Sequence, residues 1–413
     1  MAPKLQAPRG TYDMLPEQAA ARLALETVAR RVLEGAGYER IETPVFEATE
    51  LFSRGVGAST DIVQKEMFTF SDRGERSLTL RPEGTAPICR AYVEHGMHML
   101  PLPVKRWYSG PFFRDERAQA GRFKQFSQIG AEAIGTDDPA VDAECITLLW
   151  TILVELGVGG IELRLGSLGT PATRAGYRAE LTAYLRAHEE RLSPEVAARI
   201  DLNPLRAFDA DHPGTREVMA GAPILMDALA PEDLQHFEEV RARLDAAGVS
   251  YRLDPTLVRG LDYYSRTLFE FTSDVLGAQS AVGGGGRYDG LVEQLGGPHT
   301  PACGWAAGIE RILLSAEPRP LPREPCDLYV AGTGVPAFAL AAEARRAELN
   351  VQLELAGRSR KGQRKQAARL GADFVALVED DGSIVLEDVV NGDSESVPGA
   401  SAAVAHILKG RHL

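Results

Sequence analysis

Apolar residues recur at helical spacing in several parts of the chain. In residues 17–36 they lie three or four positions apart, which predicts an amphipathic helix that ends at Gly37. Residues 84–96 and 139–156 predict two further helices. Helices of this kind bury one face against another layer, and the segments between them are the candidates for that layer.

The segments between these helices predict strands. Residues 38–52 predict a strand that breaks at Pro44 and leads into a helix. Residues 66–81 predict a hairpin that turns at Asp72-Arg73-Gly74, and residues 104–133 predict two strands joined by a polar loop. We therefore expect an α+β fold, with an antiparallel sheet and flanking helices.

A helical insertion and a linker divide this pattern. Residues 170–246 are mostly helical in pattern and interrupt the strand-rich sequence, which resumes at 249–282. Five prolines in residues 315–327 predict a linker. We expect a catalytic domain over 1–325 with this inserted subdomain, and an α/β domain over 326–413 with parallel strands.

Composition says more about the compartment and the general class of the protein than about its function. The formal net charge of −13 disfavours a protein coated in nucleic acid, although a local basic patch remains possible on such a chain. None of the four cysteines belongs to a CxxC pair, so we expect reduced thiols in a cytoplasmic protein and no zinc site. No run of about 18 apolar residues predicts a membrane span.

The predicted strands in 104–133 carry residues that can hold a nucleotide. Arg114 and Glu116 alternate on one strand, and Phe126, Gln128 and Glu132 follow on the other. Arginine binds phosphate oxygens, an aromatic ring stacks on a purine, and glutamate accepts from an exocyclic amine. A solvated hairpin with cross-strand ion pairs explains the spacing equally simply and is the commoner case.

An arginine stands alone in an apolar run. Arg259 lies in LVRGLDYYSRTLFEF, residues 257–271, so we expect it to be at least partly buried and to need an anionic partner. That partner is either a ligand or a structural carboxylate, Asp254 or Asp262. Spacing alone does not separate the two.

Three weaker patterns accompany it. GGGGRYDG, residues 283–290, permits close backbone approach to a ligand or a strand, although a flexible turn is the simpler interpretation. Arg311 begins a helix and either binds a phosphate or purine or faces solvent. Glu83, where a strand gives way to a helix, either caps that helix or pairs with a ligand ammonium.

The C-terminal part of the chain contains one strongly basic segment. Six cations and no acid occur within residues 358–370. Helical spacing groups several of them on one side, which suits a phosphate backbone, although a solvated helix face is as common.

Taken together and in this order, the motifs resemble those of the histidyl-tRNA synthetases, a family of class II aminoacyl-tRNA synthetases. The resemblance covers nearly the whole chain. It rests on these stretches: RGTYDMLP (9–16), ETPVFEATELF (42–52), LRPEGTAPICRAY (80–92), FRDERAQAGRFKQFSQIGAE (113–132), NPLR (203–206), LVRGLDYYSRTLFEF (257–271), GGGGRYDGL (283–291) and GWAAGIER (304–311).

The resemblance implies a reaction and a role for each site residue. It implies activation of L-histidine by ATP, with Mg²⁺ on the ATP phosphates and no metal fixed by the protein alone, followed by transfer to tRNA(His). The catalytic residues would be Arg114 and Arg259. The ATP-binding residues would be Arg114, Glu116, Arg122, Phe126 and Arg311. The histidine-binding residues would be Glu83, Thr85, Arg114, Gln128, Glu132, Arg259, Tyr263, Tyr264 and Tyr288.

It also implies partners. Gln119 and Lys124 would meet the acceptor end of the tRNA, in a loop where Ala118 and Lys124 replace the usual proline and arginine. The cations expected near the anticodon are Arg358, Arg360, Lys361, Arg364 and Lys365. A homodimer around Pro44 is implied, and neither DNA nor a membrane is an expected partner.

Two other functions fit parts of the pattern. A catalytically silent paralogue of this family serves as a regulatory subunit in histidine biosynthesis, but it lacks the anticodon domain and its catalytic arginines are degraded. This chain keeps Arg114, Arg259 and Arg311. A class II synthetase for another amino acid is disfavoured by LVRGLDYY and Glu132.

Overall fold

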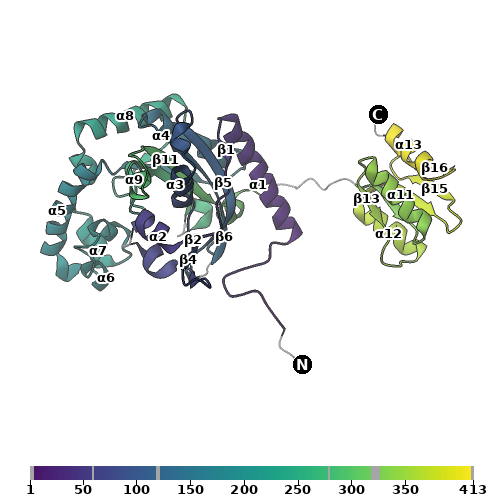
Figure 1. The fold of residues 1–413 in the computed structure, drawn as a ribbon, viewed down its shortest axis with the longest axis horizontal. Coiled ribbons are helices and arrows are strands. Elements are labelled where there is room, and N and C mark those ends of the chain that lie inside the picture. Colours follow the sequence, from purple (N-terminus) through teal and green to yellow (C-terminus); the bar gives the residue numbers. More distant parts are fainter. Residues whose placement is uncertain (1–3, 58–59, 118–120, 278–279, 318–325, 411–413) are drawn as a thin grey trace. The chain divides into compact units, whose positions relative to one another are not determined.

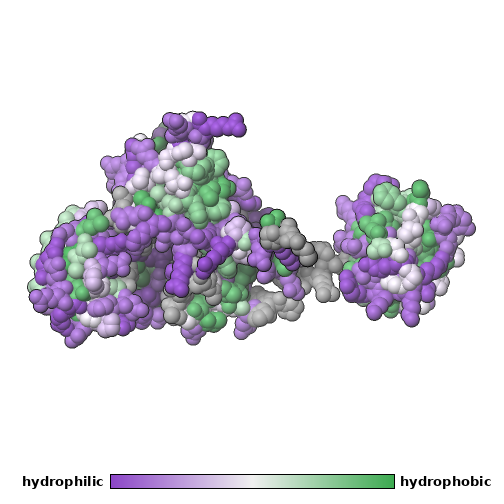
Figure 2. Space-filling view, turned by 90° about the horizontal axis from the view of Figure 1, so that it is seen from below, coloured by the Kyte–Doolittle hydropathy of each residue, from purple (hydrophilic) through white to green (hydrophobic). Residues whose placement is uncertain are grey.

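The computed structural model describes residues 4–57, 60–117, 121–277, 280–317 and 326–410. The chain divides into two compact units, Met1–Arg319 and Pro320–Leu413, which are described separately (Figure 1). On the face that Figure 2 shows, hydrophilic residues predominate and hydrophobic residues form patches on each unit.

An eight-stranded sheet forms the centre of the first unit. Its outermost strands pair in parallel with their neighbours, and every other pairing is antiparallel. In spatial order the strands are β1 (Glu39–Arg40), β5 (Val104–Phe113), β6 (Gln125–Ile134), β11 (Ala302–Gly308), β10 (Ala281–Arg287), β9 (Ser265–Ser273), β7 (Ile161–Ser167) and β8 (Arg252–Leu253). The predicted antiparallel sheet with flanking helices is confirmed.

A smaller antiparallel sheet lies beside it. Its order is β2 (Phe46–Ala48), β4 (Ser77–Leu80) and β3 (Thr69–Ser71), which confirms the predicted hairpin. Asp72 accepts hydrogen bonds from the backbone N–H groups of Gly74 and Arg76 and so closes the turn. The short helix α2 (Thr49–Phe52) follows β2 and continues into a wider helical turn over Ser53–Gly57, and a second wide turn spans Ile62–Glu66.

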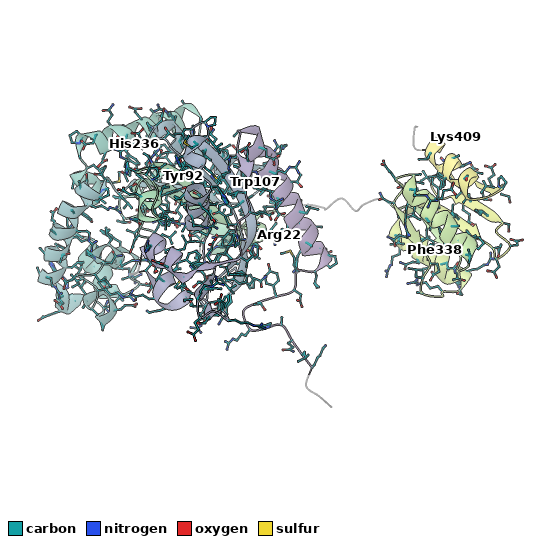
Figure 3. All side chains as sticks on the ribbon, viewed as in Figure 1. Arg22, Tyr92, Trp107, His236, Phe338 and Lys409 are labelled. Atoms are coloured by element: carbon teal, nitrogen blue, oxygen red, sulfur yellow. The ribbon has the colours of Figure 1, made fainter. Side chains whose placement is uncertain are left out.

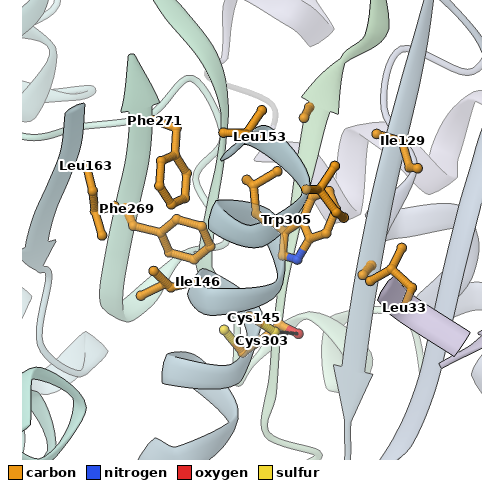
Figure 4. Packing of buried hydrophobic residues seen from close by; sticks show 14 of the residues in the cluster. Leu33, Ile129, Cys145, Ile146, Leu153, Leu163, Phe269, Phe271, Cys303 and Trp305 are labelled. Carbon is orange, nitrogen blue, oxygen red and sulfur yellow. Dashed lines mark hydrogen bonds between the residues drawn. The ribbon is translucent and has the colours of Figure 1, made fainter. Parts of the chain in front are cut away.

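Helices cover one face of the large sheet. They are α1 (Pro16–Gly35), α4 (Pro139–Glu155), α8 (Pro231–Ala246) and α10 (Ile309–Ser315). Cys145, Ile146 and Leu153 on α4 pack against Phe269 and Phe271 of β9 and Trp305 of β11 (Figure 4). Arg22 on α1 and His236 on α8 mark this layer in Figure 3.

The other face carries a second hydrophobic cluster. It joins α3 (Thr85–Glu94) and α9 (Leu291–Gln294) to the sheet through buried residues that include Tyr108, Leu268 and Tyr288. Tyr92 of α3 lies on this side. Trp107 of β5 belongs instead to the cluster under α1, α4, α8 and α10. All four cysteines are buried and reduced: Cys89, Cys145, Cys303 and Cys326.

The inserted helical segment has a core of its own. It contains α5 (Pro171–Ala187), α6 (Pro194–Ala197) and α7 (Pro213–Met219), packed around Tyr177, Leu181 and Leu185. Proline stands at the first position of each helix, where its missing N–H costs nothing, and Thr170, Ser193 and His212 cap the three N-termini. Pro171, Pro194 and Pro213 therefore mark helix starts in this segment.

The second unit is a three-layer α/β arrangement. Its strands follow the order β13 (Val351–Leu353), β12 (Cys326–Ala331), β14 (Ala372–Val378), β15 (Ile384–Asp388) and β16 (Ser394–Val397). The first three are parallel, as predicted, and the last two are antiparallel. Helices α11 (Val335–Arg346) and α13 (Ala400–Gly410) cover one face, and α12 (Arg360–Leu370) covers the other; Phe338 lies on α11 and Lys409 on α13 (Figure 3). No described helix is long and apolar enough to cross a membrane.

The glycine cluster is a central strand, so the interpretation of 283–286 as a flexible turn is wrong. A Cβ at Gly285 would lie 2.0 Å from the carbonyl oxygen of Gly304, and one at Gly286 would lie 2.4 Å from the carbonyl oxygen of Thr267. Neighbouring strands occupy the space that a side chain needs, and this close approach is what requires glycine there.

We expect Gly285→Ala to destabilise the first unit by about 1–3 kcal/mol, because the new methyl group overlaps a neighbouring strand. Gly176 on α5 is the matched control, since nothing lies within 4 Å of a Cβ there. Gly176→Ala should stabilise by about 0.5–1 kcal/mol. Urea unfolding followed by tryptophan fluorescence measures both, because the three tryptophans belong to the first unit. An unchanged midpoint for Gly285→Ala would contradict the packing.

Candidate active site

A pocket of about 420 Å³ opens on the sheet face opposite α4. Most of the residues predicted from the sequence line it together: Glu83, Thr85, Arg114, Glu116, Arg122, Phe126, Gln128, Arg259, Tyr263, Tyr264 and Arg311. Glu132 and Tyr288 lie directly behind this lining, and Glu132 accepts hydrogen bonds from Thr85 and from Tyr288.

Side chains alternate along each strand, so one face of the sheet supplies the hydrophobic core and the other supplies the pocket. On β6, Ile129 and Ala131 enter the core under the helices, whereas Gln128 and Glu132 point to the pocket side. On β9, Phe269 and Phe271 belong to the core, and Glu270 between them lines the pocket. The period of two therefore builds the floor of the site.

The structure corrects the placement of Arg114 and Glu116. Strand β5 ends at Phe113, so neither residue lies on a strand face as predicted. The Arg114 N–H still donates to the Lys124 carbonyl on the neighbouring segment. At the next residue the chain leaves the sheet, and the Asp115 N–H donates to the backbone carbonyl of Glu66. Both side chains still line the pocket.

Five arginine side chains line this pocket: Arg114, Arg122, Arg206, Arg259 and Arg311. Arg114 donates through Nε to the Pro82 carbonyl at 3.0 Å and lies 5.3 Å from the centre of the Phe126 ring. Arg122 forms an ion pair with Glu116 at 3.3 Å. Arg311 is half-buried on the pocket wall and does not face open solvent, and burial lowers its pKa from the usual range.

Arg259 is held by an acid that sequence reasoning did not select. It forms an ion pair with Glu270, which also binds Arg164. Asp254 pairs with Arg164, and Asp262 accepts from Asn203, so neither of the two proposed partners serves Arg259. The pKa of Arg259 is raised, because burial, which opposes the charge, is outweighed by Glu270 and the neighbouring tyrosines.

Glu83 acts both as a cap and as part of the pocket. Its carboxylate accepts from the N–H groups of Thr85 and Ala86 at 2.8 and 2.9 Å, at the start of α3. The Tyr263 hydroxyl approaches the same carboxylate at 3.4 Å. Burial raises the pKa of Glu83, and these hydrogen bonds oppose that rise. Glu83 can therefore both cap α3 and pair with a ligand ammonium, the two interpretations that the sequence left open.

Glu132 is a fully buried carboxyl in a cage of hydroxyl groups. Thr85 donates to one oxygen at 2.8 Å, and Tyr288 donates to the other. The Tyr263 ring packs against Tyr264 in a tilted arrangement and against Tyr288 edge-on, with ring centres 4.8 and 5.8 Å away. Burial raises the pKa of Tyr264 to about 12, so its hydroxyl keeps its proton. Glu132 and the tyrosines thus offer fixed donors and acceptors in a small volume.

Burial raises the pKa of Glu132 to about 8, from an ordinary value of 4.5. Between these values the folded protein binds a proton that the unfolded chain has released. The stability of the unliganded protein should therefore fall as the pH rises from about 4.5 to about 8, by up to about 1.4 kcal/mol per unit. Glu132→Gln removes this titration. In thermal melts its Tm relative to the parent should rise between pH 5 and pH 8, and a constant difference would contradict the shift.

Gln128 carries an unsatisfied polar atom. Its buried Oε1 has no hydrogen-bond partner among the residues that the structure describes. Leaving such an atom unpaired costs about 1–3 kcal/mol, and pairing with a ligand donor would recover that cost. The side chain lines the pocket, so a ligand can reach it.

Some predicted residues lie outside the pocket. Lys124 pairs with Asp115 and does not line it, and Gln119 falls outside the described residues, as does Ala118. The basic helix α12 belongs to the second unit. Two of its cations pair with acids from other segments of that unit, Arg360 with Glu379 and Arg364 with Glu387, and Arg358, just before the helix, pairs with Glu354.

Sequence reasoning missed several acids around the site. Glu66, Asp61 and Glu270 line the pocket, and burial raises the pKa of Glu66. Glu270 was detectable as the one charged position in the alternating run LFEF. Glu66 and Asp61 had no comparable pattern. No group of three or more His, Cys, Asp or Glu suited to a metal ion occurs within the described part of the chain.

Comparison with known proteins identifies the family. The family model described as histidyl-tRNA synthetase matches residues 10–312. A histidine–tRNA ligase of Desulforamulus reducens is 46% identical over 402 residues, covering 94% of this chain and 96% of that protein. One of Moorella thermoacetica is 47% identical over 405 residues, covering 95% and 96%.

Solved structures agree with this assignment. The apo histidyl-tRNA synthetase of Staphylococcus aureus superposes with a TM-score of 0.80 at 34% identity, covering 98% of this chain and 100% of that one. A Bacillus halodurans protein described as an ATP phosphoribosyltransferase regulatory subunit or histidyl-tRNA synthetase shares the fold, at 22% identity and a TM-score of 0.63. The chain belongs to the histidyl-tRNA synthetase family.

Proposed function

We propose that the protein is a histidine–tRNA ligase. It activates L-histidine with ATP to histidyl-adenylate and pyrophosphate, and then transfers histidine to the terminal ribose of tRNA(His). One observation carries this proposal: Arg114, Arg122, Arg259 and Arg311 line the same pocket that has Glu132 buried behind it. We propose the cytoplasm as the place of this reaction, because translation uses its product there.

The first step needs positive charge and no protein nucleophile. The histidine carboxylate attacks the α-phosphorus of ATP, a P–O bond forms to the carboxylate, and the bond to pyrophosphate breaks. Negative charge gathers around one phosphorus in the transition state, where preorganised guanidinium groups stabilise it. Arg114 and Arg259 take this role, and holding both substrates in place lowers the barrier by about 7–11 kcal/mol.

The ATP base and tail are bound by flanking residues. Phe126 stacks on the adenine and Glu116 accepts from its exocyclic amine, while Arg122 and Arg311 bind the terminal phosphates. The ion pair between Arg122 and Glu116 keeps both side chains beside Phe126 before ATP enters. Their arrangement is therefore set in advance.

Histidine is recognised at both ends. Glu83, Thr85 and Gln128 receive its α-amino group, which satisfies the unpaired Gln128 oxygen. Glu132 and Tyr264 bind the two imidazole nitrogens, and Tyr263 and Tyr288 surround the ring. A site built to hydrogen-bond a substrate group rejects analogues that lack it by about 10⁴–10⁵-fold.

Mg²⁺ accompanies the ATP phosphates. It takes one or two carboxylates, phosphate oxygens and several waters rather than a complete protein cage, which fits a pocket where Glu66 is the half-buried acid near Arg114. When bound, the ion neutralises phosphate charge. Attack and departure are oriented by the arginines described above.

The tRNA meets both units. Gln119 and Lys124 contact its acceptor end, and the second unit, residues 320–413, binds the anticodon region through α12. Arg358, Arg360 and Arg364 are held by acids, so Lys361 and Lys365 are the cations of the predicted set without an ion pair among the described residues.

Lys361→Glu combined with Lys365→Glu should raise the KM for tRNA(His) by about 10-fold or more and leave pyrophosphate exchange unchanged, because lost phosphate contacts weaken RNA binding only. Lys409→Glu, an exposed lysine on α13, is the matched control and should have little effect. Aminoacylation kinetics measure the difference. Equal behaviour of the two variants would contradict the assignment of α12.

We also propose a homodimer formed by the small sheet. Val45, Phe46 and Phe70 are exposed there, at 39, 50 and 42%, and the rings of Phe46 and Phe70 contact at 6.1 Å between centres. Apolar side chains gathered in this way are typical of a protein interface. Sedimentation of the protein at micromolar concentration tests it, and a monomer would contradict it.

Pyrophosphate exchange into ATP, run with the twenty amino acids separately, tests the proposed activity. Exchange should depend on L-histidine and fail with histidine analogues that lack a ring nitrogen. Exchange driven equally by another amino acid would overturn the proposal.

A further inference from the structure

A second cavity, of about 300 Å³, lies between the inserted helices and the loop that carries Arg259. Its polar lining comes from both parts of the first unit: Arg174, Arg178, Asn203, Arg206, Arg259 and Asp262. Arg206 and Arg259 also line the catalytic pocket, so the two spaces share a wall. This cavity has no role in the activity described so far.

Two of the arginines in this cavity have no ion-pair partner in the described part of the chain. Four arginines line the cavity and Asp262 is the one carboxylate in the lining, but Arg259 is already paired with Glu270. Arg174 and Arg178 lie one turn apart on α5, and neither forms an ion pair with any residue that the structure describes. Like charges at this spacing repel each other, so their placement on one helix face disfavours the empty state.

The two guanidinium groups are nevertheless held in place. Arg174 donates to the Tyr264 carbonyl at 2.6 Å, and Arg178 donates to the Leu202 carbonyl at 2.9 Å. Each bond uses one nitrogen and leaves the others to a ligand, since a guanidinium carries five N–H donors. Burial lowers the pKa of Arg174, and an anion would offset the loss of solvent there. Fixed donors of this kind suit the oxygens of a phosphate group.

We propose that this cavity binds a phosphate group, namely the phosphodiester next to the terminal ribose of tRNA. This inference rests on the proposed ligase function. The terminal hydroxyl must reach the acyl group held near Arg259, and the phosphate of the same nucleotide lies one ribose farther out. A phosphate site that adjoins Arg259 satisfies this requirement. Arg174 and Arg178 bind the phosphate, and Arg206 flanks it.

Pyrophosphate is the other source of the same chemistry. It leaves on the side of Arg122 and Arg311, neither of which lines this cavity. The cavity is walled by the inserted helix α5, which none of the proposed ATP contacts involves. The observations therefore favour RNA.

The test uses Arg178→Gln in the full-length protein, because this side chain is exposed and its loss leaves the Arg174 contact to Tyr264 intact. We expect the KM for tRNA(His) to rise about 10-fold, and the slope of log affinity against log salt to fall by about 1. Arg178→Lys keeps the charge and should restore most of the affinity. Histidine-dependent exchange should stay unchanged.

Arg216→Gln is the matched control, since it removes the same charge from the inserted segment but away from this cavity. If Arg178→Gln behaves like Arg216→Gln in tRNA charging, the inference is overturned. A higher KM for pyrophosphate with unchanged tRNA kinetics would overturn the RNA assignment in favour of pyrophosphate. Absence of histidine-dependent exchange in the unmodified protein would instead refute the proposed function.

Discussion

Replacing Arg259 by alanine is expected to lower kcat for histidine-dependent pyrophosphate exchange by about 10²–10³-fold, the usual cost of losing one preorganised transition-state donor. The side chain is aligned by Glu270 and lines the pocket wall. Its guanidinium stabilises charge that develops only as the α-phosphorus reacts. The KM for histidine should therefore change less than kcat.

Arg164→Ala provides the matched control for this experiment. Arg164 binds the same carboxylate, Glu270, at 3.2 Å but does not line the pocket. Its loss should leave exchange within a few-fold of the parent. In Arg259→Ala, Arg164 still pairs with Glu270, so the fold should persist, as a thermal melt can verify. Normal exchange in the Arg259 variant would refute the catalytic role.

Glu132→Gln is expected to lower kcat/KM for histidine by about 10- to 100-fold, mostly through KM. The Glu132 carboxyl can pass its proton to the bound imidazole and then accept a charged hydrogen bond, which contributes about 1.5–3 kcal/mol, whereas an amide cannot. The substitution keeps the size of the side chain and removes one acceptor from the cage formed with Thr85 and Tyr288. Steady-state exchange at varied histidine concentration measures it.

Tyr288→Phe changes the surroundings of the Glu132 carboxyl without changing the carboxyl itself. It removes one donor to Glu132 but keeps the ring that packs against Tyr263. We expect a smaller rise in the KM for histidine than in Glu132→Gln. Histidine binding unaffected by either change would show that this part of the pocket does not contact the imidazole.

The sequence predicted the elements of the fold well where one periodicity dominated. The helices, the paired strands of 104–133 and the parallel strands of the second unit all follow from spacing of apolar residues. The glycine cluster was misjudged because glycine marks both turns and close strand packing. The distinction at Gly285 depends on Gly304 and Trp305, which lie beside it only after folding.

The site was predicted through its residue types rather than its geometry. Arg259, Glu132 and Tyr264 were selected from their motifs, but the partner of Arg259 was not, because Arg259 lies in the loop before β9 and only folding brings it to Glu270 on that strand. Pairing of α12 with acids from β15 and from the segment after β14 was equally invisible, since charges far apart in sequence carry no mutual spacing. Contacts between distant segments are what periodicity cannot supply.

The buried cysteines give each unit an internal reporter. Cys89, Cys145 and Cys303 lie in the first unit and Cys326 in the second, and burial raises the pKa of Cys89, Cys303 and Cys326. A thiol that is both inaccessible and protonated reacts with alkylating reagents only when its surroundings open. Labelling rates at Cys326 and Cys303 would therefore time the opening of the two units separately, and histidine and ATP should slow labelling at Cys303 but not at Cys326.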